Sequence, residues 1–416
     1  MKRQNQIRQT MMLVGFIVFI DTAGVGLILP VLPQLIMKLT DTTLDRAAEL
    51  GGWLLFTYAV MQFLFAPVIG GLSDRYGRRP VLLVTLATLG IDYGLMAWAP
   101  TLTWLFVGRS ISGIMGASFA AANSCIADIV PRDERGKAFG MLGGLSAAGF
   151  VLGPVIGGLL GGLGLRLPFV GAAVLALIGA VIGWVILQET LAPERRRHFS
   201  LARANPLGSL VQMARTPLVF GCLAVIFMIQ LASQSQFSTW SYYGLAAFGW
   251  SPLVTGLTIA FFGMLLVVMQ GFGSGPIIAR FGAARVPLIC LPFGIASFLL
   301  LAFAPNTQVV LVAILLGSMT GPVFPALQSL MSARVAEDAQ GELQGAIASA
   351  ISLTSILGPP VMTGVFGTFT DRQGPYFPGA PFILAAALAV LAVGLLAWVL
   401  HCYAELKPVA HLEIGQ

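Results

Sequence analysis

Long apolar runs recur along the whole sequence, and they constrain the fold more than any other feature. A helix needs roughly 20 apolar residues to cross the hydrocarbon core of a bilayer. The chain is 57% hydrophobic and only 10% charged, whereas soluble domains carry about 25% charged residues. We therefore predict an all-α integral membrane protein with twelve transmembrane helices at residues 11–36, 51–72, 81–99, 102–125, 138–162, 167–187, 217–245, 252–273, 286–304, 307–330, 345–368 and 379–402.

The distribution of Lys and Arg predicts the orientation of these helices. The first apolar run is too long for a signal peptide, so we expect it to be retained as a span. The N-terminus, alternate loops and the C-terminus are rich in Lys and Arg, and the opposite loops hold only Lys38, Arg46, Arg166 and Arg372. Basic loops stay on the cytoplasmic side. We predict a multi-pass protein of the cell inner (plasma) membrane with both termini in the cytoplasm.

Several other classes of protein are disfavoured by the sequence. The four cysteines lie in or beside apolar runs without CxxC spacing, so neither a disulfide framework nor a metal site is expected. The GxxxxGK[ST] loop of ATP-hydrolysing proteins is absent. The net charge of +6 follows the membrane topology and does not indicate a nucleic-acid partner. We expect no enzyme activity, no cofactor, and no obligate protein partner.

The sequence repeats itself at a constant offset of 205 residues. The matching positions include Gly70 and Gly275, Arg75 and Arg280, Gly77 and Gly282, Gly116 and Gly321, and Gly153-Pro154 and Gly358-Pro359. Such a repeat is typical of transporters built from two parallel halves. We predict two pseudo-symmetric six-helix bundles at residues 1–190 and 217–416, joined by a cytoplasmic linker at 191–216.

The loop after the second span reads GGLSDRYGRRPVLL, from Gly70 to Leu83. It resembles the cytoplasmic signature of the major facilitator superfamily, and the resemblance implies the fold and transport function of that family. Glycines permit a tight reversal, and the charged residues suit hydrogen bonds to helix ends and carboxylates. The resemblance implies a gating latch of Gly70, Asp74, Arg75, Gly77, Arg78 and Arg79. The second-half copy is degraded, with Ala279 in place of Asp74.

The fifth span contains GFVLGPVIGG, in which glycines recur every four residues. Small residues on one helix face let a second helix approach closely, and a proline inside the helix invites a kink. The pattern resembles the motif of the antiporter branch of the superfamily and implies export in exchange for protons. The residues of this motif are Gly149, Gly153, Pro154, Gly157 and Gly158.

Further segments resemble tetracycline exporters of the superfamily over most of the chain. They include FIDTAGVGLILPVLPQL in the first span, GIDYG in the third and GRSISG in the fourth. The resemblance implies efflux of a small amphipathic drug or metabolite, with tetracycline-like compounds among the candidates. The exporters that this chain resembles carry a histidine in the eighth span and an aspartate in the ninth, and the positions that the resemblance matches to them here are Leu266 and Gly294. Proton coupling is therefore expected to depend on the first half.

Three charged residues lie within the predicted spans of the first half: Asp21, Asp92 and Arg109. Ionisable residues inside a membrane are costly and usually mark a functional site. Asp92 and Arg109 are at similar distances on either side of the turn at Pro100, so we predict that they pair. We predict that these three residues couple transport to protons, although a static ion pair is an alternative for Asp92 and Arg109.

The substrate site of such a transporter lies near the middle of the membrane between the halves. Amides among aromatic rings would suit an amphipathic ligand, although each could equally bond a neighbouring helix. The candidate lining residues are Gln62, Asn123, Gln230, Gln234, Gln236, Trp240, Tyr243, Phe262, Gln270 and Gln328. The alternatives to proton-coupled efflux are a uniporter or proton-coupled importer of a small metabolite, and a non-pumping membrane sensor of the same fold.

Overall fold

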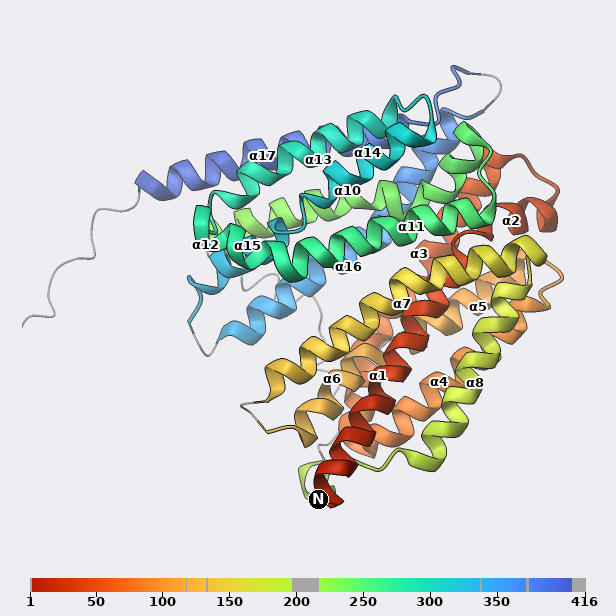
Figure 1. Cartoon of the computed structure of the whole chain (residues 1–416), viewed down its shortest axis with the longest axis vertical. Helices are drawn as coiled ribbons and strands as arrows, with labels where there is room; N and C mark the ends of the chain where they lie inside the picture. The colour runs from red at the N-terminus through yellow and green to blue at the C-terminus, as the bar shows by residue number, and fades with distance from the viewer. Residues whose placement is uncertain are drawn as a thin grey trace, which may run out of the picture. The chain divides into compact units, whose positions relative to one another are not determined.

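The computed structural model describes residues 2–116, 118–131, 134–196, 217–336, 339–371 and 374–405. In these residues the chain is helical almost throughout (Figure 1). The helices of the first part are α1 (Lys2–Ile28), α2 (Leu32–Thr40), α3 (Leu44–Tyr76), α4 (Arg78–Ala97), α5 (Leu102–Met115), α6 (Ser118–Ile129), α7 (Arg135–Leu163) and α8 (Leu167–Ile186). Those of the second part are α10 (Pro217–Phe248), α11 (Pro252–Val268), α12 (Ser274–Phe281), α13 (Val286–Ala302), α14 (Thr307–Ser318), α15 (Val323–Ser332), α16 (Gln340–Thr368) and α17 (Ala380–Glu405).

The twelve predicted spans are confirmed. Ten helical segments of the described chain are long and apolar enough to cross a membrane, and α5 and α13 supply two shorter apolar helices at the fourth and ninth predicted positions. Many large apolar side chains point outward, among them Leu163, Val185 and Phe272, which are more than three-quarters exposed. Helices satisfy their own backbone hydrogen bonds, so they can carry such side chains into lipid.

Some of the spans are interrupted where the sequence predicted continuous helices. The first span ends at Ile28 and continues as α2 only after a turn at Leu29–Val31, because Pro30 and Pro33 limit helical hydrogen bonding. The fourth span ends as α5 at Met115 and resumes as α6. The eighth span contains a π-helical turn, η3 (Met269–Gly273), before it continues as α12.

The internal repeat appears in the backbone. Gly77 and Gly282 both end a helix with positive φ, at 106° and 81°, in a region that favours glycine. Gly116 and Gly321 also correspond, and each lies where its span is interrupted, Gly116 after α5 and Gly321 between α14 and α15. The 205-residue offset therefore relates backbone features as well as residue types.

The chain forms two compact units. Unit 1 contains residues 1–205, 236–264 and 359–378, and unit 2 contains 206–235, 265–358 and 379–416. Helices α10, α11 and α16 each contribute to both units, so the units differ from the repeat-based halves, which stay a prediction. Of the predicted linker, the structure describes a 3-10 turn at Pro193–Arg195, and residues 197–216 lie outside the described residues.

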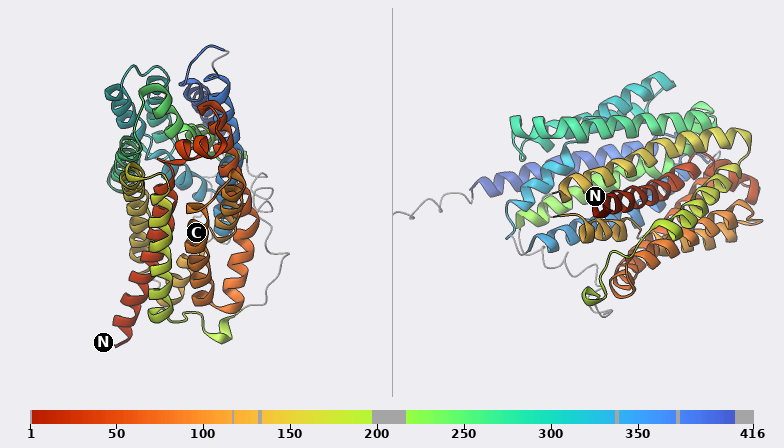
Figure 2. Two further views of the ribbon diagram at one scale, coloured as in Figure 1. Left: turned by 90° about the vertical axis from the view of Figure 1, so that its right-hand side faces the viewer. Right: turned by 60° about the horizontal axis from the view of Figure 1, so that its bottom comes forward.

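Within unit 1, α1 packs along α7, α8 and α6, as the red and yellow helices of Figure 1 show. Helix α4 packs on α8 and α5, and α3 packs on α5. Helix α1 (red) also lies beside α7 (yellow) in the further views of Figure 2. This packing brings the charged residues of α1, α4 and α5 into the interior of one bundle.

Candidate functional site

Asp92 is buried in unit 1, with 1% of its surface exposed. Its Oδ2 atom accepts a hydrogen bond from the Ser112 hydroxyl on α5. Its Oδ1 atom is buried without a hydrogen-bond partner and lies 2.8 Å from where a Cβ on Gly108 would be. Gly108 therefore leaves the space that the carboxyl group occupies between α4 and α5.

Arg109 is also buried, but the predicted ion pair with Asp92 is not formed. The Nη2 atom of Arg109 donates to the sulfur of Met96 at 3.6 Å, and no Asp92–Arg109 contact within 4.0 Å is among the ion pairs of the described chain. The carboxylate bonds instead to Ser112, one turn along α5 from Arg109, through Oδ2. Met96 and Ser112 are neighbours that the sequence did not single out as partners.

Asp21 lies half-buried on α1. Its charge and that of Arg109 both act electrostatically on Tyr58 of α3 and Tyr93 of α4. Asp92 also acts on Tyr93. The three predicted coupling residues thus belong to one electrostatic neighbourhood, together with two tyrosines that the sequence analysis missed. Tyr93 directly follows Asp92 in the sequence, and this adjacency could have indicated that it belongs to the same neighbourhood.

The predicted cytoplasmic latch centres on Arg78, whose side chain is 10% exposed. Its guanidinium bonds Asp74 Oδ1 at 2.6 Å through Nη1 and Asp128 Oδ2 at 3.1 Å through Nε. Its backbone N–H donates to Glu189 Oε1 at 2.8 Å, and the same carboxylate oxygen accepts from the backbone of Leu191. Arg78 therefore joins α3, α4, α6 and the segment that follows α8. Asp128 was not predicted.

The other latch residues have separate contacts. The Glu189 carboxylate occupies the position that a side chain on Gly77 would take, so glycine is required there for space as well as for its φ. Arg79 donates to the Trp184 carbonyl at 2.8 Å and lies over the ring of that residue. Arg75 lies over Tyr76, and the Cβ position of Gly70 is open.

The glycines of the antiporter-like motif bring α7 onto the backbone of α1. A Cβ on Gly149 would lie 2.6 Å from the Phe19 carbonyl oxygen, and one on Gly153 would lie 2.6 Å from that of Ala23. A Cβ on Gly157 would collide with the Leu27 carbonyl. Three residues spaced by four therefore form one contact face, as small residues between membrane helices do.

The remaining two residues of the motif face α11 within unit 1. A Cβ on Gly158 would lie 2.6 Å from the Pro252 carbonyl oxygen. Reciprocally, a Cβ on Gly256 would collide with the Pro154 carbonyl, and the Pro154 ring fills the space beside Gly26. Pro154 is thus held between α1 and α11.

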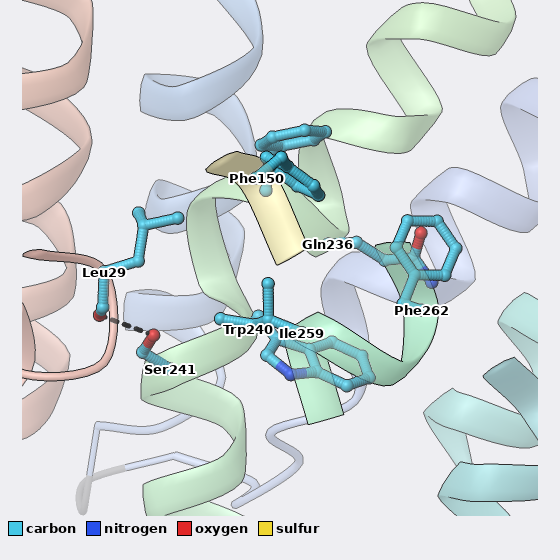
Figure 3. Close-up of a pocket in the computed structure, with 8 residues that line it drawn as sticks. Leu29, Phe150, Gln236, Trp240, Ser241, Ile259 and Phe262 are labelled. Carbon is cyan, nitrogen blue, oxygen red and sulfur yellow. Dashed lines mark hydrogen bonds between the residues drawn. The ribbon is translucent and has the colours of Figure 1, made fainter. Parts of the chain in front are cut away.

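A pocket of about 440 Å³, part of it open space, lies within unit 1. It is lined mostly by rings and aliphatic groups, with the amide of Gln236 and the hydroxyl of Ser241 as side-chain polar groups (Figure 3). Its lining residues are Leu29, Phe150, Gln236, Phe237, Trp240, Ser241, Ile259 and Phe262. Of the predicted substrate residues, Gln236, Trp240 and Phe262 are brought together here.

Contacts around the pocket hold its wall in place. Ser241 donates to the Leu29 carbonyl at 2.7 Å, which ties α10 to the end of α1 (Figure 3). The Trp240 indole donates to Thr258 at 3.0 Å. The rings of Phe150 and Phe237 lie 5.7 Å apart in a tilted arrangement. The sequence pattern contained no signal for Phe150 or Leu29, because Phe150 comes from α7 and Leu29 from the turn after α1, both far from α10 in the chain.

The other predicted substrate residues lie outside this pocket. Gln62 donates to the Tyr58 hydroxyl at 3.3 Å and to the Gly116 carbonyl at 3.0 Å, so its amide satisfies the interrupted end of α5. Gln328 donates to Gln344, Gln234 packs on Gly358, and the Tyr243 ring packs against Trp240. Asn123 lies on α6, Gln230 on α10, and Gln270 in the π-helical turn.

The two positions at which this chain departs from the tetracycline exporters lie in unit 2. Leu266 is half-buried. Gly294 is buried, and a Cβ there would lie 2.8 Å from the Thr320 methyl group. A larger side chain at residue 294 would therefore have to displace Thr320.

Comparison with known proteins defines the class of this protein. The family model of the Major Facilitator Superfamily matches residues 13–359 and 231–410. The chain belongs to the major facilitator superfamily and is a multi-span membrane transporter. It is 39% identical to the class C tetracycline resistance protein of Escherichia coli, over 89% of this chain and 92% of that protein. It is 38% identical to the class G tetracycline resistance protein of Vibrio anguillarum, over 86% of this chain and 91% of that protein.

Solved structures share the fold at lower identity. The human organic anion transporter MFSD10 (TETRAN) superposes with a TM-score of 0.69 at 23% identity, covering 94% of this chain and 99% of that one. A bacterial homologue of the human lysosomal transporter Spinster, inward-facing and occupied, superposes with a TM-score of 0.74 at 16% identity, covering 95% and 97% of the chains. These likenesses support the fold alone.

Proposed function

We propose that this protein is a secondary active transporter that exports a small amphipathic drug or metabolite in exchange for protons. The observation that carries this proposal is the charged cluster in unit 1 of half-buried Asp21 with buried Asp92 and Arg109. Intramembrane carboxyl groups that take up and release protons can couple a proton gradient to transport. A proton that enters down about 100 mV releases roughly 2.3 kcal/mol.

The relatives support drug export as the direction and class of transport. The E. coli and V. anguillarum proteins are tetracycline resistance proteins, and a Bacillus subtilis relative at 27% identity is a multidrug resistance protein. We propose the cell inner membrane as the location, with both termini cytoplasmic, because the basic loops are concentrated on that side of the predicted topology.

We propose the aromatic pocket of unit 1 as part of the substrate compartment. Phe150, Trp240 and Phe262 supply apolar surface, and Gln236 supplies one amide that can both donate and accept hydrogen bonds. Ligand sites combine mostly apolar walls with a few placed polar groups. An amphipathic compound with a flat ring system would match this lining.

The direct test is transport by the purified protein in proteoliposomes, with tetracycline and ethidium as probes. An imposed pH gradient should drive accumulation, and Asp21→Asn should abolish that accumulation. Asp41→Asn is the matched control, because Asp41 is exposed and in a left-handed conformation that asparagine adopts readily. If Asp21→Asn combined with Asp92→Asn left gradient-driven accumulation intact, proton coupling through this cluster would be wrong.

The same assay separates the alternatives. A uniporter would equilibrate the probe at a rate that does not depend on the gradient. A proton-coupled importer would accumulate it in the opposite direction in oriented vesicles, and a sensor would bind without transport. Growth protection of a drug-sensitive host by the expressed protein would then identify the compounds exported.

A further inference from the structure

Two phenols, those of Tyr58 and Tyr93, lie beside the charged cluster, and their positions suit a role in the proposed proton coupling. Tyr93 of α4 is 2% exposed, and Tyr58 of α3 is half-buried. Both interact electrostatically with Asp21 and with Arg109. A phenol can donate to a carboxylate while it accepts from a guanidinium.

The Tyr93 hydroxyl points at the face of α1 that carries Asp21. Its oxygen fills the space where a side chain on Gly24 would be, and its ring carbon Cε2 lies 2.9 Å from that Cβ position. Gly24 follows Asp21 by three residues, so the two lie on one helix face. Asp92, one residue earlier on α4, points instead toward Ser112 of α5.

The Tyr58 hydroxyl lies on the face of the fourth span that carries Arg109. Arg109, Gly113 and Gly116 recur at intervals of four and three residues, which places them along one side of that span. A Cβ on Gly113 would lie 2.5 Å from the Tyr58 carbonyl oxygen, and one on Gly116 would lie 2.9 Å from the Tyr58 hydroxyl. The Gln62 amide donates to the same hydroxyl and fixes the ring orientation.

Helices α7 and α8 also pack on α1 near Asp21. On α7, the Ser146 hydroxyl lies 3.1 Å from the Thr22 hydroxyl of α1. The next residues of α7 that contact α1 are the glycines of the antiporter-like motif. Helix α8 packs Ala176 against Ile17 and Ile20. Asp21 interacts electrostatically with both phenols, each of which also interacts with Arg109, and Tyr93 interacts with Asp92 as well.

We propose that Tyr58 and Tyr93 are positioning residues for proton exchange at Asp21. Their hydroxyl groups donate to the Asp21 carboxylate after the proton leaves, and accept from Arg109 when Asp21 is protonated and uncharged. The proton itself is carried by Asp21, and both phenols stay neutral. The inference rests on the proposed proton coupling and adds the residues that set the pH at which Asp21 exchanges its proton.

Infrared difference spectroscopy tests this directly, because it needs neither substrate nor transport. The carboxyl C=O band of Asp21, assigned by its loss in Asp21→Asn, is followed against pH in the reconstituted full-length protein. We expect its midpoint to move to higher pH by about one unit in Tyr93→Phe and in Tyr58→Phe, because each loses a hydrogen bond to the charged form. Tyr242→Phe is the matched control, since it removes a buried phenol hydroxyl without a hydrogen-bond partner.

Midpoints in both phenylalanine variants within about 0.2 unit of the wild-type value would overturn the proposal. The two variants lie on different helices, so each tests the idea if the other fails to fold, and thermal unfolding of each in detergent reports folding. Failure of the proposed function has a different signature: the Asp21 band titrates and shifts as expected, but an imposed gradient drives no accumulation of tetracycline or ethidium by the wild type.

Discussion

The hydroxyl of Ser112 on α5 donates a hydrogen bond to Oδ2 of Asp92 on α4, and both side chains are at most 2% exposed. The second Asp92 oxygen is buried without a hydrogen-bond partner. The Asp92 carboxyl group is therefore stabilised by one hydrogen bond, from Ser112, and by its electrostatic interaction with Arg109. This hydrogen bond joins α4 to α5 and also fixes the position of a carboxyl group of the charged cluster.

Ser112→Ala should lower the free energy of unfolding by about 1–3 kcal/mol, because it removes the hydrogen-bond partner of a buried carboxyl group. Thermal unfolding in detergent can be followed with a thiol-reactive dye that reports exposure of the buried Cys125 and Cys222. Ser110→Ala is the control, since Ser110 bonds only the Phe106 carbonyl of its own helix. Equal stability of the two variants would contradict this role for Ser112.

Removing a carboxylate partner of Arg78 should lower the free energy of unfolding, and the loss should be larger for the more buried partner. The Asp128 side chain is 20% exposed and that of Asp74 is 44% exposed. We expect Asp128→Asn to cost about 1–3 kcal/mol, and Asp74→Asn about 1 kcal/mol or less because solvent screens that pair. Thermal unfolding measures both changes.

The control for the Arg78 contacts is the pair of Arg46 and Glu49, whose side chains are 60% and 35% exposed. Glu49→Gln should change stability by less than about 0.5 kcal/mol. A larger loss for Asp74→Asn than for Asp128→Asn would show that burial does not set the strength of these pairs.

Gly153→Val should prevent assembly of α1 and α7, because the new Cβ would lie 2.6 Å from the Ala23 carbonyl oxygen and 3.0 Å from its Cα, and backbone atoms cannot yield. Size-exclusion chromatography of a fluorescent fusion reports the folded yield. Gly143→Val is the control on the same helix, since nothing lies within 4 Å of its Cβ position. Comparable yields of the two variants would contradict the packing role of the glycine face.

Trp240→Ala and Phe262→Ala should each weaken tetracycline binding by about tenfold, because each removes an aromatic wall of the pocket. Equilibrium binding of radiolabelled tetracycline to the purified protein measures this change without depending on tryptophan fluorescence. Phe220→Ala is the control, since that ring is on α10 but exposed and outside the pocket. Unchanged affinity in both pocket variants would place the binding site elsewhere.

Gly263→Ala tests the pocket by a different route. A Cβ there would lie 3.1 Å from Phe150 Cδ1 and 3.2 Å from Val151 Cγ2, so the Phe150 ring must shift by a few tenths of an ångström. We expect lower tetracycline affinity with normal folded yield in the same binding assay. Affinity equal to that of the wild type would mean that Phe150 does not contact the ligand.

The spans, the repeat and the residue types of the motifs were readable from the sequence because they depend on local properties. A run of apolar residues selects a membrane helix wherever it lies, since each helix satisfies its own backbone hydrogen bonds. The spacing of Gly149, Gly153 and Gly157 predicts a face of small residues on α7 for the same reason. The positive φ of Gly77 and Gly282 follows from their positions at helix ends.

The partners of these residues were decided only by the tertiary structure. Asp92 bonds Ser112 instead of Arg109, Arg78 recruits Asp128, and Gln62 satisfies the end of α5 instead of lining the pocket. The pocket wall combines Leu29, Phe150 and α10, which are far apart in the chain. Hydropathy and the helical period predict which side of a helix is apolar or carries small residues. Helix packing determines which helix lies against that side and in which register, and therefore which polar atoms come into contact.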